Sequence, residues 1–170
     1  ARVKIDNFEV YKDQLKQRLD PTVTIMQGIN NYIRKKPKKV VFADGEDENM
    51  LKAAIAFKNS KLGTPILVGK EELIKEQIKK IGYNENFDIE IVNSKNKSKR
   101  DNYVKYLFKK LQREKGMLEW DCDRLVRNER VVWASCMVAC GDADAMVTGN
   151  TRRYSSSLEK IVKVVDPRPG

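Results

Sequence analysis

From Lys38 onward, short runs of β-branched and other apolar residues alternate with longer segments whose apolar residues recur at helical spacing. The short runs predict four strands, at residues 40–43, 65–68, 89–92 and 145–148. The longer segments predict helices at residues 46–60, 71–81, 98–114, 129–140 and 152–165. This alternation indicates right-handed crossovers and a mostly parallel sheet, and therefore an α/β fold.

The four strands are expected to differ in how they are covered. The first, second and fourth are apolar on both faces, which is typical of strands with helices on both sides. The third, Ile-Glu-Ile-Val at 89–92, alternates between apolar and polar residues and is expected at an edge of the sheet.

Residues 1–37 follow a different pattern. Two segments, 8–19 and 22–36, carry apolar residues at helical spacing, and Pro37 ends the second segment. The change at Lys38 predicts a helical lead-in or linker over 1–37 and an α/β part over 38–170. The sequence starts at Ala1 rather than Met and stops at a turn-like Pro-Arg-Pro-Gly, so we expect a segment of a longer polypeptide.

Composition narrows the class of protein. The 170 residues, 41% apolar and 34% charged, fit the range of about 100–200 residues for one domain. The longest apolar run is far below the ~18 residues of a membrane span, and no signal-peptide core is visible, so we expect a cytoplasmic protein without membrane contact. No histidine and three cysteines exclude a disulfide framework, a His-ligated zinc site and His-dependent catalytic triads.

The net charge of +10 raises the hypothesis of a nucleic-acid-binding module. The excess of lysine concentrates in residues 95–116, without a zinc knuckle, an aromatic RNA-binding pattern or a recognition helix. We therefore interpret these lysines as the solvated side of a helix.

Two further motifs have simpler explanations. Cys136 and Cys140 lie four residues apart in a segment that is apolar nearly all round, which is typical of small buried side chains rather than of a metal or redox site. The segment Gly63–Lys70 resembles a phosphate loop, but its glycine spacing is wrong and Glu71 follows the lysine, so we reject that interpretation.

Acidic residues gather where the first predicted strand ends. Asp44 directly follows this strand, and Glu46, Asp47 and Glu48 come next. Ligands of open α/β sheets bind beyond the carboxyl ends of strands. The helix dipole explains the three later acids equally well. Asp44 is therefore the candidate site residue here.

The segment after the last predicted strand is a candidate anion site. Small and hydroxylated residues lead into a predicted helix, where backbone amides and the dipole favour negative charge. The candidates for a phosphate or acyl-CoA ligand are Thr148, Gly149, Thr151, Arg152, Tyr154 and Ser155. An ordinary helix cap, with Thr151 as N-cap and the arginines solvated, is the alternative.

The order of several motifs is similar to a known family. Residues 38–54, Thr-Pro-Ile-Leu-Val-Gly, Arg-Glu-Lys-Gly, Gly-Asp-Ala-Asp-Ala-Met-Val-Thr-Gly and Pro-Arg-Pro-Gly resemble the first half of the phosphate acetyl/butyryltransferases. The version at 151–170 looks most like the copy at the C-terminus of large NADP-dependent malic enzymes. The resemblance implies a three-layer α/β/α, phosphotransacetylase-like (isocitrate/isopropylmalate dehydrogenase-like) first subdomain with the second subdomain absent.

The resemblance also implies site residues. The catalytic Ser/Arg/Asp group of the acetyltransferases lies in the absent half, so no catalytic and no metal-binding residue is expected here. One CoA-contacting arginine of those enzymes falls near Arg113, with Lys115 beside it, and the other corresponds to Glu159. A carboxylate in place of a phosphate-facing cation argues against ordinary acetyl transfer.

We therefore expect a regulatory, acyl-CoA-sensing and oligomer-forming part of an NADP-dependent malic enzyme. The parent would convert malate to pyruvate and CO2 with NADP and Mg or Mn held by its malic enzyme domain, no cofactor would be held by this segment, and acetyl-CoA would be the effector. Half of an active phosphate acyltransferase is the alternative, and a basic nucleic-acid-binding module is the second alternative.

Overall fold

The computed structural model describes residues 8, 11, 12, 15, 21–83, 88–94 and 97–168, which form two compact units, 1–37 and 38–170. In the first unit, residues 8, 11, 12 and 15 are helical, and the rest of the helix predicted at 8–19 lies outside the described residues. Helix α2 (Pro21–Lys35) confirms the helix predicted at 22–36. Proline suits its first turn, and Arg34 and Lys35 in its last turn complement the dipole.

The second unit is built on a four-stranded sheet. The strands are β1 (Lys38–Phe42), β2 (Gly63–Val68), β3 (Glu90–Val92) and β4 (Ala145–Val147). Their order is β3-β2-β1-β4 and every pair is parallel, with Val41 opposite Ile66 and Met146. The predicted parallel α/β sheet is therefore confirmed.

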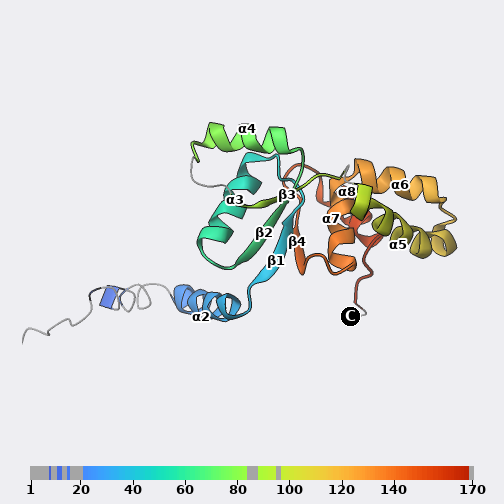
Figure 1. The fold of residues 1–170 in the computed structure, drawn as a ribbon. Coiled ribbons are helices and arrows are strands. Elements are labelled where there is room, and N and C mark those ends of the chain that lie inside the picture. The colour runs from blue at the N-terminus through green and yellow to red at the C-terminus, as the bar shows by residue number, and fades with distance from the viewer. Residues whose placement is uncertain are drawn as a thin grey trace, which may run out of the picture. The chain divides into compact units, whose positions relative to one another are not determined.

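Helices cover both faces of this sheet (Figure 1). On one side lie α3 (Glu48–Asn59) and α4 (Glu71–Ile81), each of which connects two consecutive strands. On the other side lie α5 (Lys97–Lys115), α6 (Glu119–Asn128), α7 (Arg130–Ala139) and α8 (Tyr154–Val162). This is the expected three-layer α/β/α architecture.

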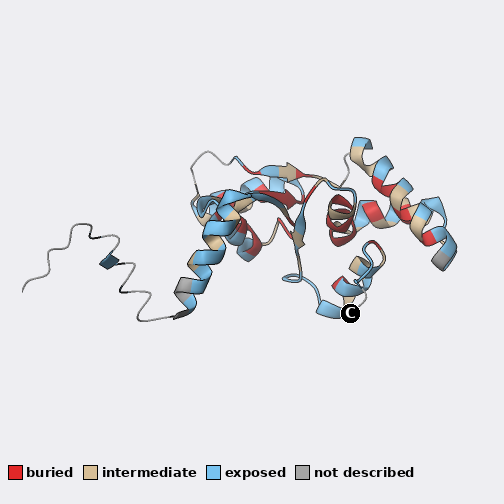
Figure 2. Cartoon of the chain, turned by 90° about the horizontal axis from the view of Figure 1, so that it is seen from below, coloured by how far each residue is buried: buried red, intermediate tan, exposed pale blue. Residues whose placement is uncertain are grey.

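The alternation of side chains along β1 and β2 separates two cores. Phe42 and Leu67 pack with apolar residues of α3 and α4. Val41 and Ile66, on the opposite face, pack with α5, α6 and α7. Successive side chains of a strand point to opposite faces, so both helical layers are held by the same two strands. The buried residues of Figure 2 lie along these strands and the inner sides of the helices.

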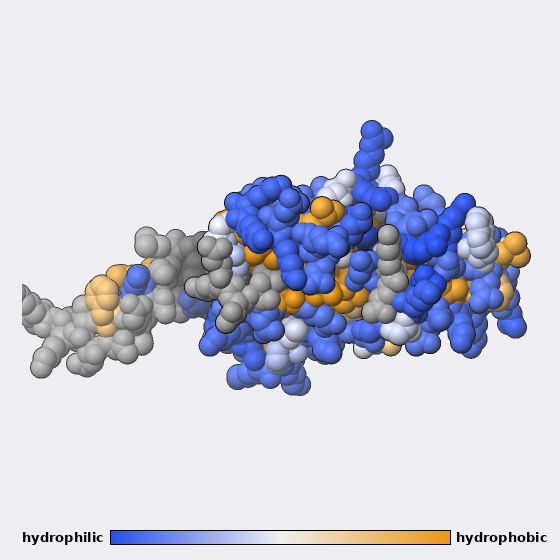
Figure 3. All heavy atoms as spheres, turned by 45° about the horizontal axis from the view of Figure 1, so that its top comes forward, coloured by the Kyte–Doolittle hydropathy of each residue, from blue (hydrophilic) through white to orange (hydrophobic). Residues whose placement is uncertain are grey.

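Helix α5 is amphipathic, as its lysine-rich sequence predicts. Tyr103, Leu107 and Leu111 are buried, whereas Lys105 and Lys109 are exposed. The face of the molecule in Figure 3 is accordingly mostly hydrophilic, with apolar residues confined to patches. No helix in the described part of the chain is both long and apolar enough to cross a bilayer.

Helix α6 was not among the predicted helices. Gly116, at φ 61°, follows α5, and Glu129 alone separates α6 from α7. Only Cys122 and Val126 of α6 are buried, so its apolar repeat is too sparse to be recognised in a charged segment.

The prediction that the last strand is covered on both sides is wrong. β4 is an edge strand, and Ala145 and Val147 are exposed. An apolar sequence favours burial of a strand, but it does not determine whether helices of this chain cover both of its faces. The prediction that 89–92 is an edge strand is confirmed, since β3 forms the other edge.

The two tryptophans allow a direct test of the core. Trp133 of α7 is fully buried and packs edge-on against Tyr103, with ring centroids 5.0 Å apart. Trp133→Ala is expected to lower the free energy of unfolding by about 3–5 kcal/mol, because it leaves a large cavity. Trp120→Ala, at a site 66% exposed, is the control and should cost less than about 1 kcal/mol. Urea unfolding followed by far-UV circular dichroism measures both, and equal losses would contradict this account of the core.

The exposed apolar side chains of β4 and α8 predict self-association. Val147 and Leu158, each 41% exposed, lie with Val162 and Val165 on this part of the surface. Exposed apolar patches promote association. We expect dimers or larger species at micromolar concentration, and Leu158→Glu should shift them toward monomer. Leu73→Glu on α4, at a leucine of similar exposure, should not. Light scattering that showed the unsubstituted 170-residue chain to be a monomer over this concentration range would contradict the prediction.

Candidate functional site

The candidate site is built where β1 and β4 end. Asp44, just beyond β1, is buried, and its carboxylate accepts hydrogen bonds from the Thr151 hydroxyl at 2.7 Å and the Thr148 hydroxyl at 3.4 Å. The Ala43 amide donates to the Val147 carbonyl at 3.0 Å. Three of the predicted site residues are therefore brought together, and their polar groups satisfy one another.

The turn after β1 makes a close approach to β2. A Cβ atom at Gly45 would lie 3.0 Å from both the Leu67 Cβ and the Val68 carbonyl oxygen, so only glycine fits without displacement. The Gly45 amide donates to that same carbonyl at 3.1 Å. This approach places the side chain of the following residue, Glu46, over the end of β2.

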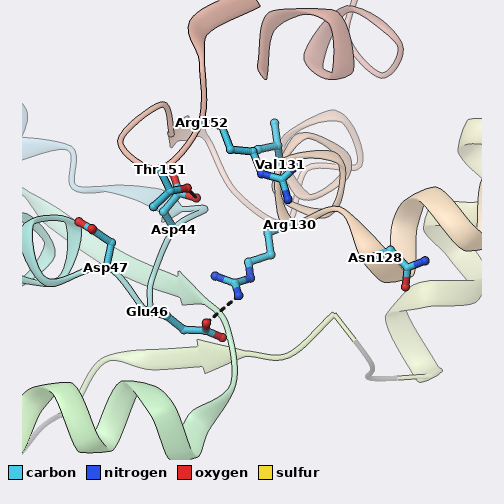
Figure 4. A pocket seen from close by; sticks show the side chains of 8 residues that line it. All are labelled: Asp44, Glu46, Asp47, Asn128, Arg130, Val131, Thr151 and Arg152. Carbon is cyan, nitrogen blue, oxygen red and sulfur yellow. Dashed lines mark hydrogen bonds and ion pairs between the residues drawn. The ribbon is translucent and has the colours of Figure 1, made fainter. Parts of the chain in front are cut away.

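Glu46 connects three parts of the chain. Its Oε1 accepts from the Lys70 amide at 2.9 Å, and its Oε2 pairs with the Arg130 guanidinium at 2.6 Å (Figure 4). Asp47 has a capping role, since its side chain accepts from the Met50 amide at the start of α3, and it also accepts from the Asn150 side chain. These acids thus have structural partners.

A cavity of about 480 Å³ opens among these groups (Figure 4). Three carboxylates and two guanidiniums line it, together with a few neutral side chains. The lining residues are Asp44, Glu46, Asp47, Asn128, Arg130, Val131, Thr151 and Arg152. We call it the polar cavity. Its charged groups nearly balance one another.

Arg152 does not project freely into the polar cavity. Its Nη1 lies 2.9 Å from Oε2 of Glu129, and the same oxygen accepts from Lys160 Nζ at 2.8 Å. Glu129, Arg130 and Asn128 were not predicted as site residues. They lie at the α6–α7 junction, and only the packing of that junction against the sheet brings them to this edge.

A second cavity, also of about 480 Å³, lies between β4 and α8. Thr148, Gly149 and Tyr154 line it with apolar side chains of both elements, and Gly149 has a φ of 109° that favours glycine. We call it the apolar cavity. Its lining also includes Met146, Val147, Ser157, Leu158 and Ile161. Ser155 lines neither cavity.

The helix after this loop starts later than expected. α8 begins at Tyr154 with Arg153 as its N-cap and no capping side chain, so Thr151 as N-cap is wrong. The Thr151 hydroxyl donates to Asp44 instead, because satisfying a buried carboxylate outweighs capping an exposed helix end. The predicted cradle residues therefore divide between the two cavities.

Arg113 and Lys115, at the end of α5, line neither cavity. Lys115 lies near Glu159 of α8. A hydrogen bond from Lys163 at 2.8 Å, with further attraction from Lys115 and Lys160, lowers the pKa of the Glu159 carboxyl. Glu159 thus lies among lysines.

The cysteines and acids do not form a metal site in the described part of the chain, where no three metal-ligating side chains of the His, Cys, Asp or Glu type converge. Cys136 is buried in α7, and burial raises the pKa of its thiol to about 12. A thiol that stays protonated is a poor nucleophile and a poor ligand. Its surroundings are those of a small apolar side chain.

Comparison with known proteins agrees with the fold and the motif order. Residues 24–170 match the family described as phosphate acetyl/butaryl transferase. The structure superposes on a phosphotransacetylase from Streptococcus pyogenes with a TM-score of 0.77 and 24% identity, over 86% of this chain and 44% of that one. This likeness shows the fold.

Among curated proteins, a probable NADP-dependent malic enzyme of Rickettsia prowazekii is 43% identical over 99% of this chain. An NADP-dependent malic enzyme of Rhizobium meliloti is 42% identical over the whole of this chain. A phosphate acetyltransferase of Helicobacter pylori is 29% identical over 92% of the chain, which covers 30% of that protein. The chain spans 22% of the length of the two malic enzymes.

The family match begins inside α2 and continues through the sheet, both helical layers and the loop that holds Asp44. The chain therefore belongs to the phosphate acetyl/butaryl transferase family and resembles the corresponding segment of NADP-dependent malic enzymes.

Proposed function

We propose that this chain is the acyl-CoA-sensing, oligomer-forming segment of an NADP-dependent malic enzyme. The observation that carries the proposal is the identity of 43% and 42% to two malic enzymes over essentially the whole chain, against 29% to a phosphate acetyltransferase. In this proposal, malate is oxidatively decarboxylated to pyruvate in the cytoplasm by a domain that the chain does not span. NADP and Mg or Mn would bind in that domain.

The two cavities support an acyl-CoA ligand. The polar cavity carries the guanidiniums of Arg130 and Arg152, which suit phosphate oxygens. The apolar cavity, between β4 and α8, suits an acyl chain. Thr148 lines the apolar cavity and donates to Asp44 of the polar cavity, so the loop of residues 148–152 borders both. An acyl-CoA has one phosphate-rich part and one apolar part.

Half of an active phosphate acyltransferase is the second candidate, favoured by the matched phosphate acetyltransferases. Glu159 weighs against it, since a carboxylate stands where the resemblance places a phosphate-contacting arginine. The lysines around Glu159 offset its charge locally, but Lys163 pairs with Glu159 itself and Lys160 pairs with Glu129, so neither replaces the missing cation.

The chain alone is expected not to form acetyl phosphate from acetyl-CoA and phosphate. The reason is that the catalytic group implied by the family lies outside this segment. A coupled assay of free CoA release should remain at the no-protein rate, with a known phosphate acetyltransferase as positive control. Robust turnover by the purified chain would contradict the regulatory proposal and favour the second candidate.

Arg152→Ala, made in the longer protein, should weaken inhibition by acetyl-CoA about tenfold, which corresponds to ~1.4 kcal/mol for one charge-assisted contact. Arg153→Ala removes a neighbouring arginine that lines neither cavity and should leave the sensitivity unchanged. The measurement is the acetyl-CoA concentration that halves malate turnover. Unchanged sensitivity of Arg152→Ala, or an equal loss of malate turnover without acetyl-CoA, would overturn the assignment.

A further inference from the structure

Glu129 holds an unusual position between two helices. It is the C-cap of α6 and the N-cap of α7, and its backbone is fixed on both sides. Its amide donates to the Leu125 carbonyl at 3.0 Å, and its carbonyl accepts from the Trp133 amide at 3.0 Å. The carboxylate is therefore carried by a rigid corner, and it cannot withdraw from its partners by a loop movement.

Both guanidiniums of the polar cavity are already paired with carboxylates. Arg130 pairs with Glu46 at 2.6 Å, and Arg152 pairs with Glu129 at 2.9 Å. An anion that enters the cavity meets two guanidiniums whose positive charge is already offset by a carboxylate, so it competes electrostatically with one of these two carboxylates. The affinity of the cavity for anions thus depends on how firmly each carboxylate holds its arginine.

Arg152 is the easier of the two to release. Its side chain is 46% exposed, so water weakens the ion pair. Glu129 also keeps a second partner when Arg152 leaves, because Lys160 contacts the same oxygen at 2.8 Å and is itself mostly buried. Releasing Arg152 therefore does not leave the partly buried Glu129 carboxylate without a cation, which would otherwise be costly.

We propose that Glu129 is a specificity-determining residue that competes with the ligand's phosphate for Arg152. The inference rests on the proposed function, because it concerns the same anion site. A singly charged carboxylate in solution cannot displace a tethered one. A multiply charged phosphate can, since it brings more negative charge to the guanidinium than a monocarboxylate does. Glu129 thereby admits phosphate-bearing ligands and rejects small monocarboxylates.

The test uses inorganic pyrophosphate as the probe, titrated into the 170-residue chain by isothermal calorimetry. Glu129→Gln keeps the shape of the side chain and removes its charge. We expect Glu129→Gln to bind pyrophosphate about tenfold more tightly than the unsubstituted 170-residue chain, a gain of ~1.4 kcal/mol. Acetate should bind Glu129→Gln but not the unsubstituted chain, because the variant lacks the carboxylate that excludes a monocarboxylate from Arg152. Glu119→Gln, the same charge change at an exposed site on α6, should leave the affinity unchanged.

A second pair of variants separates competition from simple repulsion. In an Arg152→Ala background, Glu129→Gln should give no gain, because the arginine that the two anions share is absent. A gain in pyrophosphate affinity that persists without Arg152 would overturn the proposal. Equal pyrophosphate affinity of Glu129→Gln and the unsubstituted chain would also overturn it. Thermal unfolding by circular dichroism identifies any variant that is not folded. If Glu129→Gln does not fold, Glu129→Asp replaces it, and its shorter side chain, which reduces the reach to Arg152, is expected to give the same gain in pyrophosphate affinity.

Titration of the same proteins with acetyl-CoA distinguishes this inference from the proposed function. Acetyl-CoA binding that is equally tight in the unsubstituted chain and Glu129→Gln would overturn the role of Glu129 and leave the acyl-CoA proposal standing. A tenfold gain for pyrophosphate without any acetyl-CoA binding would support the role of Glu129 and overturn the acyl-CoA proposal.

Discussion

The arrangement at the sheet edge depends on one buried carboxylate. Asp44 lies beyond the end of β1, where its charge is removed from water. A buried carboxylate without hydrogen bonds costs several kcal/mol, and here the hydroxyls of Thr151 and Thr148 supply them. This requirement fixes the loop after β4 against the end of β1, and through that loop it fixes where Arg152 and the start of α8 lie.

The charges around this carboxylate are paired across elements that are distant in sequence. Glu46 of the β1–α3 turn holds Arg130 of α7, and Glu129 holds both Arg152 and Lys160. The Glu46 pair joins the β1–α3 turn to α7, and the Glu129 pairs join the α6–α7 corner to α8 and the loop before it, all at the edge where ligands of parallel sheets bind. The ion pairs that stabilise this edge of the sheet are therefore also the contacts with which an incoming anion competes.

The sheet itself illustrates how a fold is specified by alternation. Along β1, Val41 faces α5–α7 and Phe42 faces α3 and α4, and β2 repeats this with Ile66 and Leu67. The two inner strands are thus buried on both faces. β4 has an equally apolar sequence, but it lies at the edge of the sheet with Val147 exposed. The chain covers 44% of a phosphotransacetylase of the same fold.

The strands, most of the helices, the parallel α/β class and the family resemblance could be predicted from the sequence alone, because they depend on local periodicity and on motif order. The sequence also indicated Asp44 and, separately, Thr148, Thr151 and Arg152 as candidates beyond the carboxyl ends of two strands, and the structure brings them to one edge. The sequence did not predict α6, because its apolar repeat is sparse. It also did not predict that α8 starts at Tyr154, because the Thr151 hydroxyl donates to Asp44 instead of capping the helix. That Glu129 and Arg130 reach the site is visible only in the folded chain, because a corner between two helices acquires its neighbours through packing, and packing leaves no local pattern in the sequence.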